Sequence, residues 1–296
     1  MKRKILNKIT SIIAAVALSL TFSAAEPVIA YAANAATTTV PLSTARTIPV
    51  IVTDNMPYAS FSAIRSGAAF LYQNTGANAN GITVCVNAGH GTLGGEKYKT
   101  LSHPDGTPKV TGGTNAAGAT KSTAISGGMT FQDGTSEASV TLREAVILKG
   151  LLLNNGYNVL MIREGADVQL DNIARTVLAN TYANCHIALH WDSTSSDKGA
   201  FYCKVVNNAA YKAMEPVAST WAKSDLLGEY LIGGLKGAGR KIHGTGSMEM
   251  DLTQISYSTI PSVDIELGDK ASDHSDTALN NIALGLLSGI NTYFGR

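Results

Sequence analysis

The chain has 296 residues, of which 45% are hydrophobic and 15% are charged, and its formal net charge is +1 at pH 7. This composition is too apolar for a disordered protein, and it is sufficient for one large core or two small ones. Basic and acidic side chains nearly balance, which excludes a nucleic-acid binder that works through a dense basic face.

The first 36 residues have the three parts of a secretory signal peptide. A basic start, Met1–Lys8, precedes an apolar stretch, Ile9–Ala25, and small residues that suit signal-peptidase cleavage follow. An uncleaved membrane anchor is the alternative, but Ser and Thr interrupt the apolar stretch, which falls short of the roughly 20 residues that a span needs. We therefore expect cleavage of residues 1–36, no stable membrane insertion afterwards, and a protein that is secreted, extracellular or cell-wall associated.

Residues 37–80 are expected to form a linker and an amino-terminal arm. Thr37–Thr47 is rich in Thr, Ser and Ala, as linkers often are, and Ile48–Val52 favours an extended segment. Apolar residues recur at helical spacing over Phe61–Leu71, which predicts one amphipathic helix. This helical arm would dock on the main domain, and a disordered leader is the alternative.

From Ile82 onward, apolar runs alternate with helical patterns. Such alternation is typical of a parallel sheet that is covered on both faces. The sequence therefore predicts an α/β fold for residues 81–296, with a single open, largely parallel sheet and helices on both faces. The expected strands are Ile82–Val86, Tyr157–Arg163, Cys185–His190, Gly199–Val205 and Ser262–Leu267, and the expected helices are Glu137–Leu153, Asp171–Tyr182, Ala209–Leu226 and Leu279–Tyr293.

A long stretch rich in Gly, Thr and Ala, Thr92–Ser136, separates the first strand of this domain from its helix. Loops longer than about 15 residues in compact domains are usually functional or disordered. Because ligands of open α/β sheets bind at the carboxyl ends of the strands, we expect the stretch to be a rim or lid of the site.

The three cysteines, Cys85, Cys185 and Cys203, lie in apolar runs that resemble buried strands. Buried free thiols are therefore expected, and one disulfide in an oxidising exterior is the alternative. The chain has no Cys-x-x-Cys pair, which argues against a thiolate metal site.

Three residues that can bind zinc lie where predicted strands end or a helix begins: His90, Glu137 and His190. Two histidines and a carboxylate, with a fourth position left for water, form a common catalytic zinc set at the carboxyl ends of strands. Taken singly, each has a structural alternative. His90 could be a turn residue with a hydrogen-bonded imidazole, and His190 could be an ordinary residue at the end of its strand. Glu137 could be a carboxylate that the positive end of the helix macrodipole stabilises.

Glu266 is a fourth candidate because it is a carboxylate inside an apolar strand, close to the end of that strand. A buried carboxylate is costly without a partner, so Glu266 indicates either a salt bridge or an acid–base group with a shifted pKa.

Four stretches of the chain occur in a recognisable order. Val84–Gly91 ends in Gly-His-Gly, Glu137 opens a helix, Ile187–His190 closes a strand with His, and Pro261–Gly268 ends in Glu-Leu-Gly. In these motifs the chain resembles the zinc-dependent N-acetylmuramoyl-L-alanine amidases, a family of bacterial cell-wall hydrolases. The resemblance extends over about residues 82–294, which is most of the expected mature chain.

The resemblance implies that His90, Glu137 and His190 hold one zinc ion per chain and that Glu266 is the catalytic carboxylate. It further implies a peptidoglycan substrate, in which the amide between N-acetylmuramic acid and L-alanine of the stem peptide is hydrolysed by zinc-activated water. The sequence departs from the family pattern in the much longer segment before Glu137.

Two other functions stay open at this point. One is a noncatalytic wall-binding module of the same fold, and the other is a zinc peptidase that acts on stem peptides. An unidentified activating or targeting protein is also left open, because the chain has no recognisable wall-binding repeats.

Four further residues are weaker candidates for substrate contact. Arg163 ends a predicted strand and Arg175 lies inside a predicted helix, and either could bind a stem-peptide carboxylate. A structural ion pair is the alternative for both arginines. His103 lies in the long stretch, and His243 lies in the Gly-rich stretch Lys241–Ser247.

Side chains alternate along a strand, so His186 shares a face with His190, and Asp264 shares a face with Glu266. The matching positions of the amidase family are ordinarily apolar. We therefore expect His186 and Asp264 to interact beneath the metal site, directly or through water. Separate partners for the two side chains are the alternative.

Overall fold

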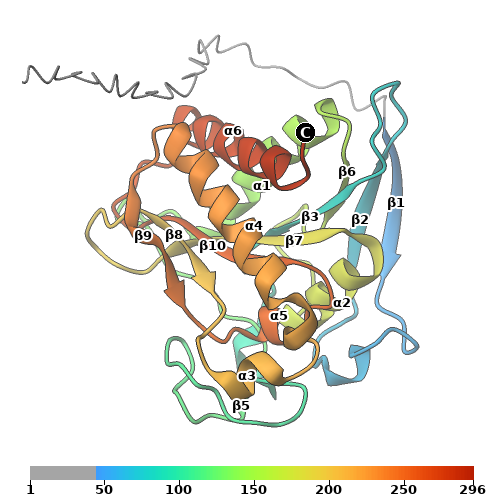
Figure 1. The fold of residues 1–296 in the computed structure, drawn as a ribbon, viewed down its shortest axis with the longest axis vertical. Helices are drawn as coiled ribbons and strands as arrows, with labels where there is room; N and C mark the ends of the chain where they lie inside the picture. The colour runs from blue at the N-terminus through green and yellow to red at the C-terminus, as the bar shows by residue number, and fades with distance from the viewer. Residues whose placement is uncertain (1–44) are drawn as a thin grey trace, which may run out of the picture. The chain divides into compact units, whose positions relative to one another are not determined.

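The computed structural model describes residues 45–296, so the predicted signal peptide lies outside the described residues. An eight-stranded sheet runs through the described part in the order β1-β2-β6-β3-β7-β10-β8-β9, as Figure 1 shows. Among residues 45–296, no helix has the length and apolar character that crossing a membrane requires.

The centre of the sheet is parallel. β3 (Thr83–Ala88) lies between β6 (Asn158–Met161) and β7 (Cys185–Asp192), and β10 (Ser262–Asp269) pairs with the other side of β7. Antiparallel pairs then join β2 to β6 and β8 to β10 toward the two edges. The predicted α/β fold is confirmed, and the parallel pairing places the carboxyl ends of β3, β7 and β10 together.

Helices cover both faces of the sheet (Figure 1). α1 (Glu137–Asn154), α4 (Val217–Gly237) and α6 (Asp276–Tyr293) pack on one face, and α2 (Asn172–Tyr182) packs on the other. Successive side chains of a strand point to opposite faces, so each central strand contributes to two cores. Val84 and Val86 of β3 join the core beneath α1, α4 and α6, whereas Cys85 joins the core beneath α2.

The segment before β3 is a pair of strands. β1 (Ala45–Ile51) pairs antiparallel with β2 (Ala68–Asn74), and β2 pairs with β6. The helix predicted over Phe61–Leu71 is therefore wrong, and the helical structure nearby is the short 3-10 turn Ala59–Phe61. Pairing with β6 decides the outcome, because it buries side chains on both faces of β2, which a helical arm could not do.

Two elements of the C-terminal half differ from the prediction. The helix expected over Ala209–Leu226 is divided into α3 (Ala209–Ala213) and α4, because Pro216 cannot continue a helix from α3. β9 (Ile242–Glu249) was not predicted, since its glycines obscure any alternation, and it pairs parallel with β8 (Ala200–Lys204). The short helix α5 (Thr253–Ser256) follows β9.

The long stretch Thr92–Ser136 contains local structure of its own. It forms the 3-10 turn Gly95–Lys97 and a two-stranded hairpin of β4 (Lys99–Leu101) and β5 (Lys121–Thr123). The hairpin forms a separate small sheet, so the stretch is a folded addition beside the main sheet.

The three cysteines are buried free thiols, as expected. Burial raises the pKa of the Cys85 and Cys203 thiols well above its usual value and raises that of Cys185 to about 12. Such thiols stay protonated and unreactive at neutral pH.

Candidate metal centre and active-site pocket

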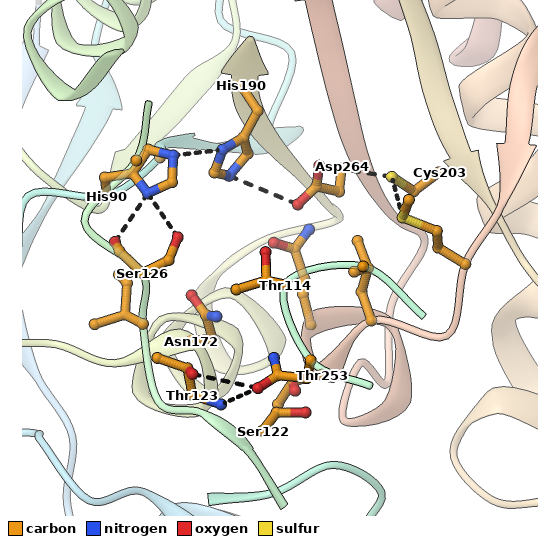
Figure 2. Close-up of a pocket in the computed structure, with 18 of the residues that line it drawn as sticks. His90, Thr114, Ser122, Thr123, Ser126, Asn172, His190, Cys203, Thr253 and Asp264 are labelled. Atoms are coloured by element: carbon orange, nitrogen blue, oxygen red, sulfur yellow. Dashed lines mark hydrogen bonds and ion pairs between the residues drawn. The ribbon is translucent and has the colours of Figure 1, made fainter. Parts of the chain in front are cut away.

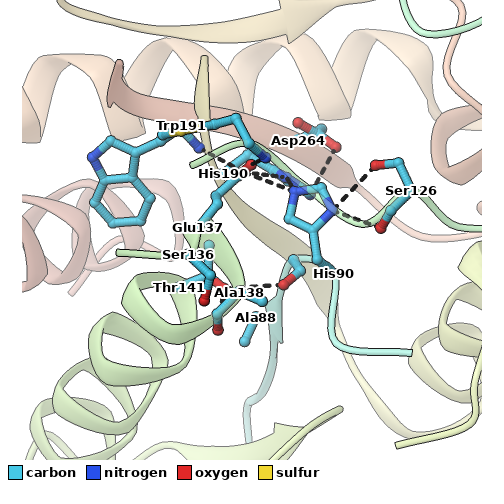
Figure 3. Close-up of polar contacts among 12 residues, drawn as sticks. Ala88, His90, Ser126, Ser136, Glu137, Ala138, Thr141, His190, Trp191 and Asp264 are labelled. Carbon is cyan, nitrogen blue, oxygen red and sulfur yellow. Dashed lines mark hydrogen bonds and ion pairs between the residues drawn. The ribbon is translucent and has the colours of Figure 1, made fainter. Parts of the chain in front are cut away.

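Three side chains from different elements meet at the carboxyl edge of the sheet (Figure 3). His90 follows β3, Glu137 is the first residue of α1, and His190 lies in β7. His90 Nε2 lies 2.8 Å from Glu137 Oε1, and His190 Nδ1 lies 3.0 Å from His90 Nε2 and 3.1 Å from Glu137 Oε1. The structure thus brings together the three residues that the sequence predicts as zinc ligands.

The backbone around His90 is held in place from two sides. His90 adopts a left-handed conformation, with φ of 63°, directly after the strand ends. Its carbonyl accepts a hydrogen bond of 2.6 Å from the Arg175 guanidinium, and its Nδ1 lies 2.9 Å from the Ser126 carbonyl oxygen. Because Ser126 fixes Nδ1, the ring presents Nε2 to Glu137 and His190.

Two backbone amides and the helix start position Glu137. The Ser136 side chain caps α1 by accepting from the Ser139 amide, so the first turn of the helix points Glu137 toward the sheet. Glu137 Oε2 accepts from the Met129 amide at 2.8 Å, and Oε1 accepts from the Trp191 amide at 3.0 Å. The carboxylate is therefore held by two separate segments.

Two glycines leave space for the imidazole rings. A Cβ atom at Gly89 would lie 2.3 Å from Cε1 of His190, and one at Gly128 would lie 2.7 Å from Cδ2 of His90. Gly128 also has φ of 86°, which other residues rarely adopt. The close contact of the rings with the backbone therefore requires glycine at both positions.

The charges around the three side chains favour a bound cation. Burial alone would raise the pKa of Glu137, but hydrogen bonds from His190 and His90 hold it well below its usual range. Burial lowers the pKa of His190, while the carboxylates of Asp264, Glu137 and Glu266 raise it to about 10. The same carboxylates would stabilise a divalent ion beside His190.

The donor atoms fit a zinc ion. The three side chains offer two imidazole nitrogens and one carboxylate oxygen, all within 4.8 Å of one another. Within the described part of the chain, this is the group of His, Cys, Asp and Glu side chains that meets the geometric condition for a metal site. Three such ligands leave the fourth position of zinc for water, as catalytic sites do.

Two carboxylates of β10 lie beside this group. Glu266 is the register partner of His190, and its Oε2 atom is buried without a hydrogen-bond partner. Burial raises the pKa of Glu266 well above its usual value, His190 opposes the shift, and Asp264 adds to it. Asp264 Oδ2 lies 3.6 Å from His190 Nε2, the ring nitrogen that faces away from His90 and Glu137.

These residues open into a cavity of about 430 Å³. Figure 2 shows His90, His190 and Asp264 on one side of the cavity, with Thr114 and Thr253 across from them. The far side comes from the long stretch, from α2 and from the segment around α5. The predicted metal ligands and Glu266 therefore share one pocket with a large part of the segment Thr92–Ser136.

The family model described as N-acetylmuramoyl-L-alanine amidase matches residues 84–290. This match covers more than half of the chain and includes His90, Glu137, His190 and Glu266. The chain belongs to the N-acetylmuramoyl-L-alanine amidase family.

Several solved amidase structures share this fold. Ami1 from Mycobacterium smegmatis aligns with a TM-score of 0.59 and 17% identity over 74% of this chain and 99% of that one. The N-acetylmuramoyl-L-alanine amidase from Clostridium difficile 630 aligns with a TM-score of 0.52 and 15% identity over 73% and 98% of the two chains. The CwlD amidase from Clostridioides difficile, solved with the GerS lipoprotein, aligns with a TM-score of 0.50 and 20% identity over 72% and 98%. The comparison with curated proteins gave no match.

Within this amidase fold, the two candidate arginines donate to backbone carbonyls, and neither forms an ion pair with another residue of the range 45–296. Arg163 is 1% exposed, and its guanidinium donates to the carbonyls of Ala88, Gly89, Ala138 and Gly165. Arg175 is also 1% exposed and lines the pocket, but its donors are bound to the turn around His90.

The two remaining candidate histidines lie outside the residues that line the amidase pocket. His103 is buried between Thr107 and Asp251, with Nε2 3.1 Å from Asp251 Oδ2. His243 lies in β9, where its ring contacts Phe201. The structure thus gives both side chains partners other than the metal centre.

The direct interaction expected between His186 and Asp264 is wrong, and its water-mediated form stays a prediction. His186 Nε2 instead accepts a hydrogen bond of 3.1 Å from Asn87 of β3, and Asp264 faces His190. The register explains the difference, because His186 pairs with Ser262 and therefore lies one pleat below Asp264. The alternative of separate partners is the one that the structure bears out.

Several pocket residues lie outside the sequence-based prediction. Thr253 and Gln254 belong to α5, a short helix whose sequence has no clear helical pattern. Asn172 lies in a predicted helix, but nothing in the sequence marks it as a pocket residue. Ser126 and Gly128 lie within the long stretch, where the run Ser-Gly-Gly could have indicated that the backbone passes close to another side chain.

Proposed function

We propose that the protein is a secreted, zinc-dependent peptidoglycan hydrolase. It cleaves the amide between N-acetylmuramic acid and the L-alanine of the stem peptide. The main support is that His90, Glu137 and His190 lie together beside Glu266, whose Oε2 atom has no hydrogen-bond partner, in a chain of the amidase family. Secretion rests on the signal-like composition of residues 1–36.

His90 Nε2, His190 Nδ1 and Glu137 Oε1 would hold the metal ion. Zinc in such a site polarises a substrate carbonyl and lowers the pKa of water. The protein contributes fixed donors, because Ser126 orients His90 and the amides of Met129 and Trp191 orient Glu137. Asp264 lies beside Nε2 of His190 and favours the proton on that nitrogen, which leaves Nδ1 free as a ligand.

Glu266 is the group that moves the proton. Its unpartnered Oε2 accepts a proton from the water that attacks the lactyl carbonyl carbon. A carbon–oxygen bond forms, and the carbon–nitrogen bond to L-alanine then breaks. The same oxygen delivers the proton to the leaving amine nitrogen, so the carboxylate is restored after each turnover.

Digestion of isolated cell wall tests this function. We expect mass spectrometry to find free stem peptides and uncleaved glycan strands, and the Glu266→Gln variant to release stem peptides at least about a hundredfold more slowly. Shortened stems would instead identify a peptidase, and binding to wall without any product would identify a wall-binding module.

An accessory protein is a further part of the proposal. The related CwlD amidase was solved in complex with the GerS lipoprotein. We extend this to an activating or targeting partner for the present chain, which is tested by comparing wall digestion with and without extracellular proteins of the same cells.

A further inference from the structure

The half of the pocket that lies across from the metal centre has polar side chains but no available charge. It is lined by Thr114, Asn115, Thr123, Asn172, Thr253 and Gln254, a group that we call the neutral subsite. These residues come from the long stretch, from the start of α2 and from α5. Figure 2 shows Thr114, Asn172, Thr123 and Thr253 together below the two imidazoles.

Two cations line the same cavity, and both are committed to the protein. Arg175 uses all five of its N–H donors, on Asn87, Ala88, Leu170, His90 and Thr92. The ammonium of Lys109 forms an ion pair of 2.9 Å with Asp251, and the side chains of the pair are 6% and 0% exposed. Arg175 therefore has no donor left for a carboxylate of the substrate, and the charge of Lys109 is already neutralised by the buried Asp251 carboxylate.

Several uncharged groups of the subsite remain free for a ligand. Within the described chain, the side chains of Thr114, Asn172 and Thr253 have no hydrogen-bond partner, although Thr253 is only 7% exposed. Gln254 donates to Ser262 and Val263, which leaves its Oε1 atom as an acceptor. Hydroxyl and amide groups supply both donors and acceptors, as a carboxamide requires.

We propose that the neutral subsite binds the stem peptide and selects stems that carry a carboxamide in place of a free carboxylate; this inference rests on the proposed amidase function. A carboxylate that enters the subsite loses water and finds no free cation, whereas a carboxamide is fully hydrogen-bonded. The carboxylates of Asp264 and Glu266 on the opposite side of the pocket add to the discrimination.

A matched pair of substrates tests the proposal: N-acetylmuramoyl-L-alanyl-D-isoglutamine and N-acetylmuramoyl-L-alanyl-D-glutamate, which differ in one carboxamide. We expect kcat/KM to be higher for the carboxamide by about tenfold to a hundredfold, with most of the difference in KM. Equal values, or a preference for the carboxylate, would overturn the proposal.

An added charge provides the matching variant. Thr114→Arg introduces a free cation at an exposed position of the subsite, and we expect it to reduce or reverse the preference. Ala117→Arg places the same charge on an exposed position of the same stretch, outside the pocket lining, and should leave the preference unchanged. A Thr114→Arg variant with the parent's preference would count against the subsite.

The two proposals fail separately. If wall is digested to free stems but the substrates are not distinguished, the amidase function stands and the subsite is wrong. If neither wall nor substrate is hydrolysed, the function is wrong. In that case the subsite is tested by the Kd values of the two muramyl peptides for the zinc-loaded Glu266→Gln variant. We expect the carboxamide to bind more tightly than the carboxylate.

Discussion

Each imidazole of the candidate metal centre directs one nitrogen to the other two proposed ligands and the second nitrogen to a neighbouring group. His90 directs Nδ1 to Ser126, and His190 directs Nε2 toward Asp264. Contacts of this kind fix the orientation and tautomer of an imidazole that serves as a metal ligand. The arrangement of the proposed metal centre therefore also depends on Ser126 and Asp264, which are not among the three proposed ligands.

Removal of His190 tests the metal assignment. We expect the His190→Ala variant to lose stoichiometric zinc by elemental analysis while its far-ultraviolet circular dichroism stays that of an α/β protein. The core of the sheet does not depend on this side chain, since Ile187 and Leu189 of the same strand supply the apolar packing. His243→Ala, at a position outside the pocket lining, serves as the control and should retain zinc. Zinc held by the His190→Ala variant as tightly as by the parent would refute the assignment.

Glu266→Gln tests the proton carrier. The amide has nearly the shape of the carboxyl but cannot accept the proton, so we expect zinc content to be unchanged and turnover to fall by about two to four orders of magnitude. Glu144→Gln is the matched control, because Glu144 is a buried carboxyl whose two oxygens, like Oε2 of Glu266, lack hydrogen-bond partners, but it lies outside the pocket lining. Parent-like hydrolysis by the Glu266→Gln variant would assign Glu266 a structural role.

At the scale of elements, one buried carboxylate connects the long stretch to the segment after β9. Asp251 accepts hydrogen bonds from the amides of Val110 and Thr111, from Lys109 and from His103. Burial would raise the pKa of Asp251, but these hydrogen bonds hold it well below its usual range. The contacts join residues about 140 positions apart in sequence and so build one wall of the pocket.

We expect Asp251→Asn to loosen this wall without disturbing the metal centre. The amide keeps the size of the side chain but removes the negative charge that Lys109 needs, so KM should rise about tenfold while zinc affinity is unchanged. Hydrogen exchange should accelerate in residues 103–118 but not in α6. Glu96→Gln, a change at an exposed position of the same stretch outside the pocket lining, is the control. An unaltered KM with unaltered exchange would show that Asp251 does not hold the wall.

At the scale of the whole molecule, the segment before β3 belongs to the main sheet. β2 contributes Leu71 to one core and Tyr72 to the other. The loop after β1 is also attached to α2, because the amides of Ala63 and Ile64 donate to the Asp171 carboxylate that caps this helix. The resemblance to the amidase family begins near residue 82, but the folded unit extends to β1.

Truncation tests this boundary. A chain that begins at residue 81 should be less stable than one that begins at residue 45, by about 5 kcal/mol, because it loses the burial of Val50, Leu71 and Tyr72 and exposes the edge of β6. Urea unfolding of the two chains measures the difference. Equal midpoints and equal slopes would show that β1 and β2 add nothing to the stability of the sheet.

Much of the centre of the fold could be predicted from local patterns. The continuous apolar runs of β3 and β7 and the helical spacing of α1 and α6 are set by residues within each element, so they are visible in the sequence. The site residues His90, Glu137 and His190 were identifiable because each lies at the end of such an element. Parallel strands bring these ends together whatever the details of packing.

The sequence by itself thus determined the α/β class and named the three side chains, His90, Glu137 and His190, that the fold brings together. The tertiary structure alone decided that Phe61–Leu71 is not a helix, because pairing with β6 outweighs the local spacing. It also decided that His186 faces Asn87 and that Asp251 anchors the pocket wall. The physical reason is the same in each case: the partner is distant in sequence, and only strand register and packing determine which polar groups meet in the interior.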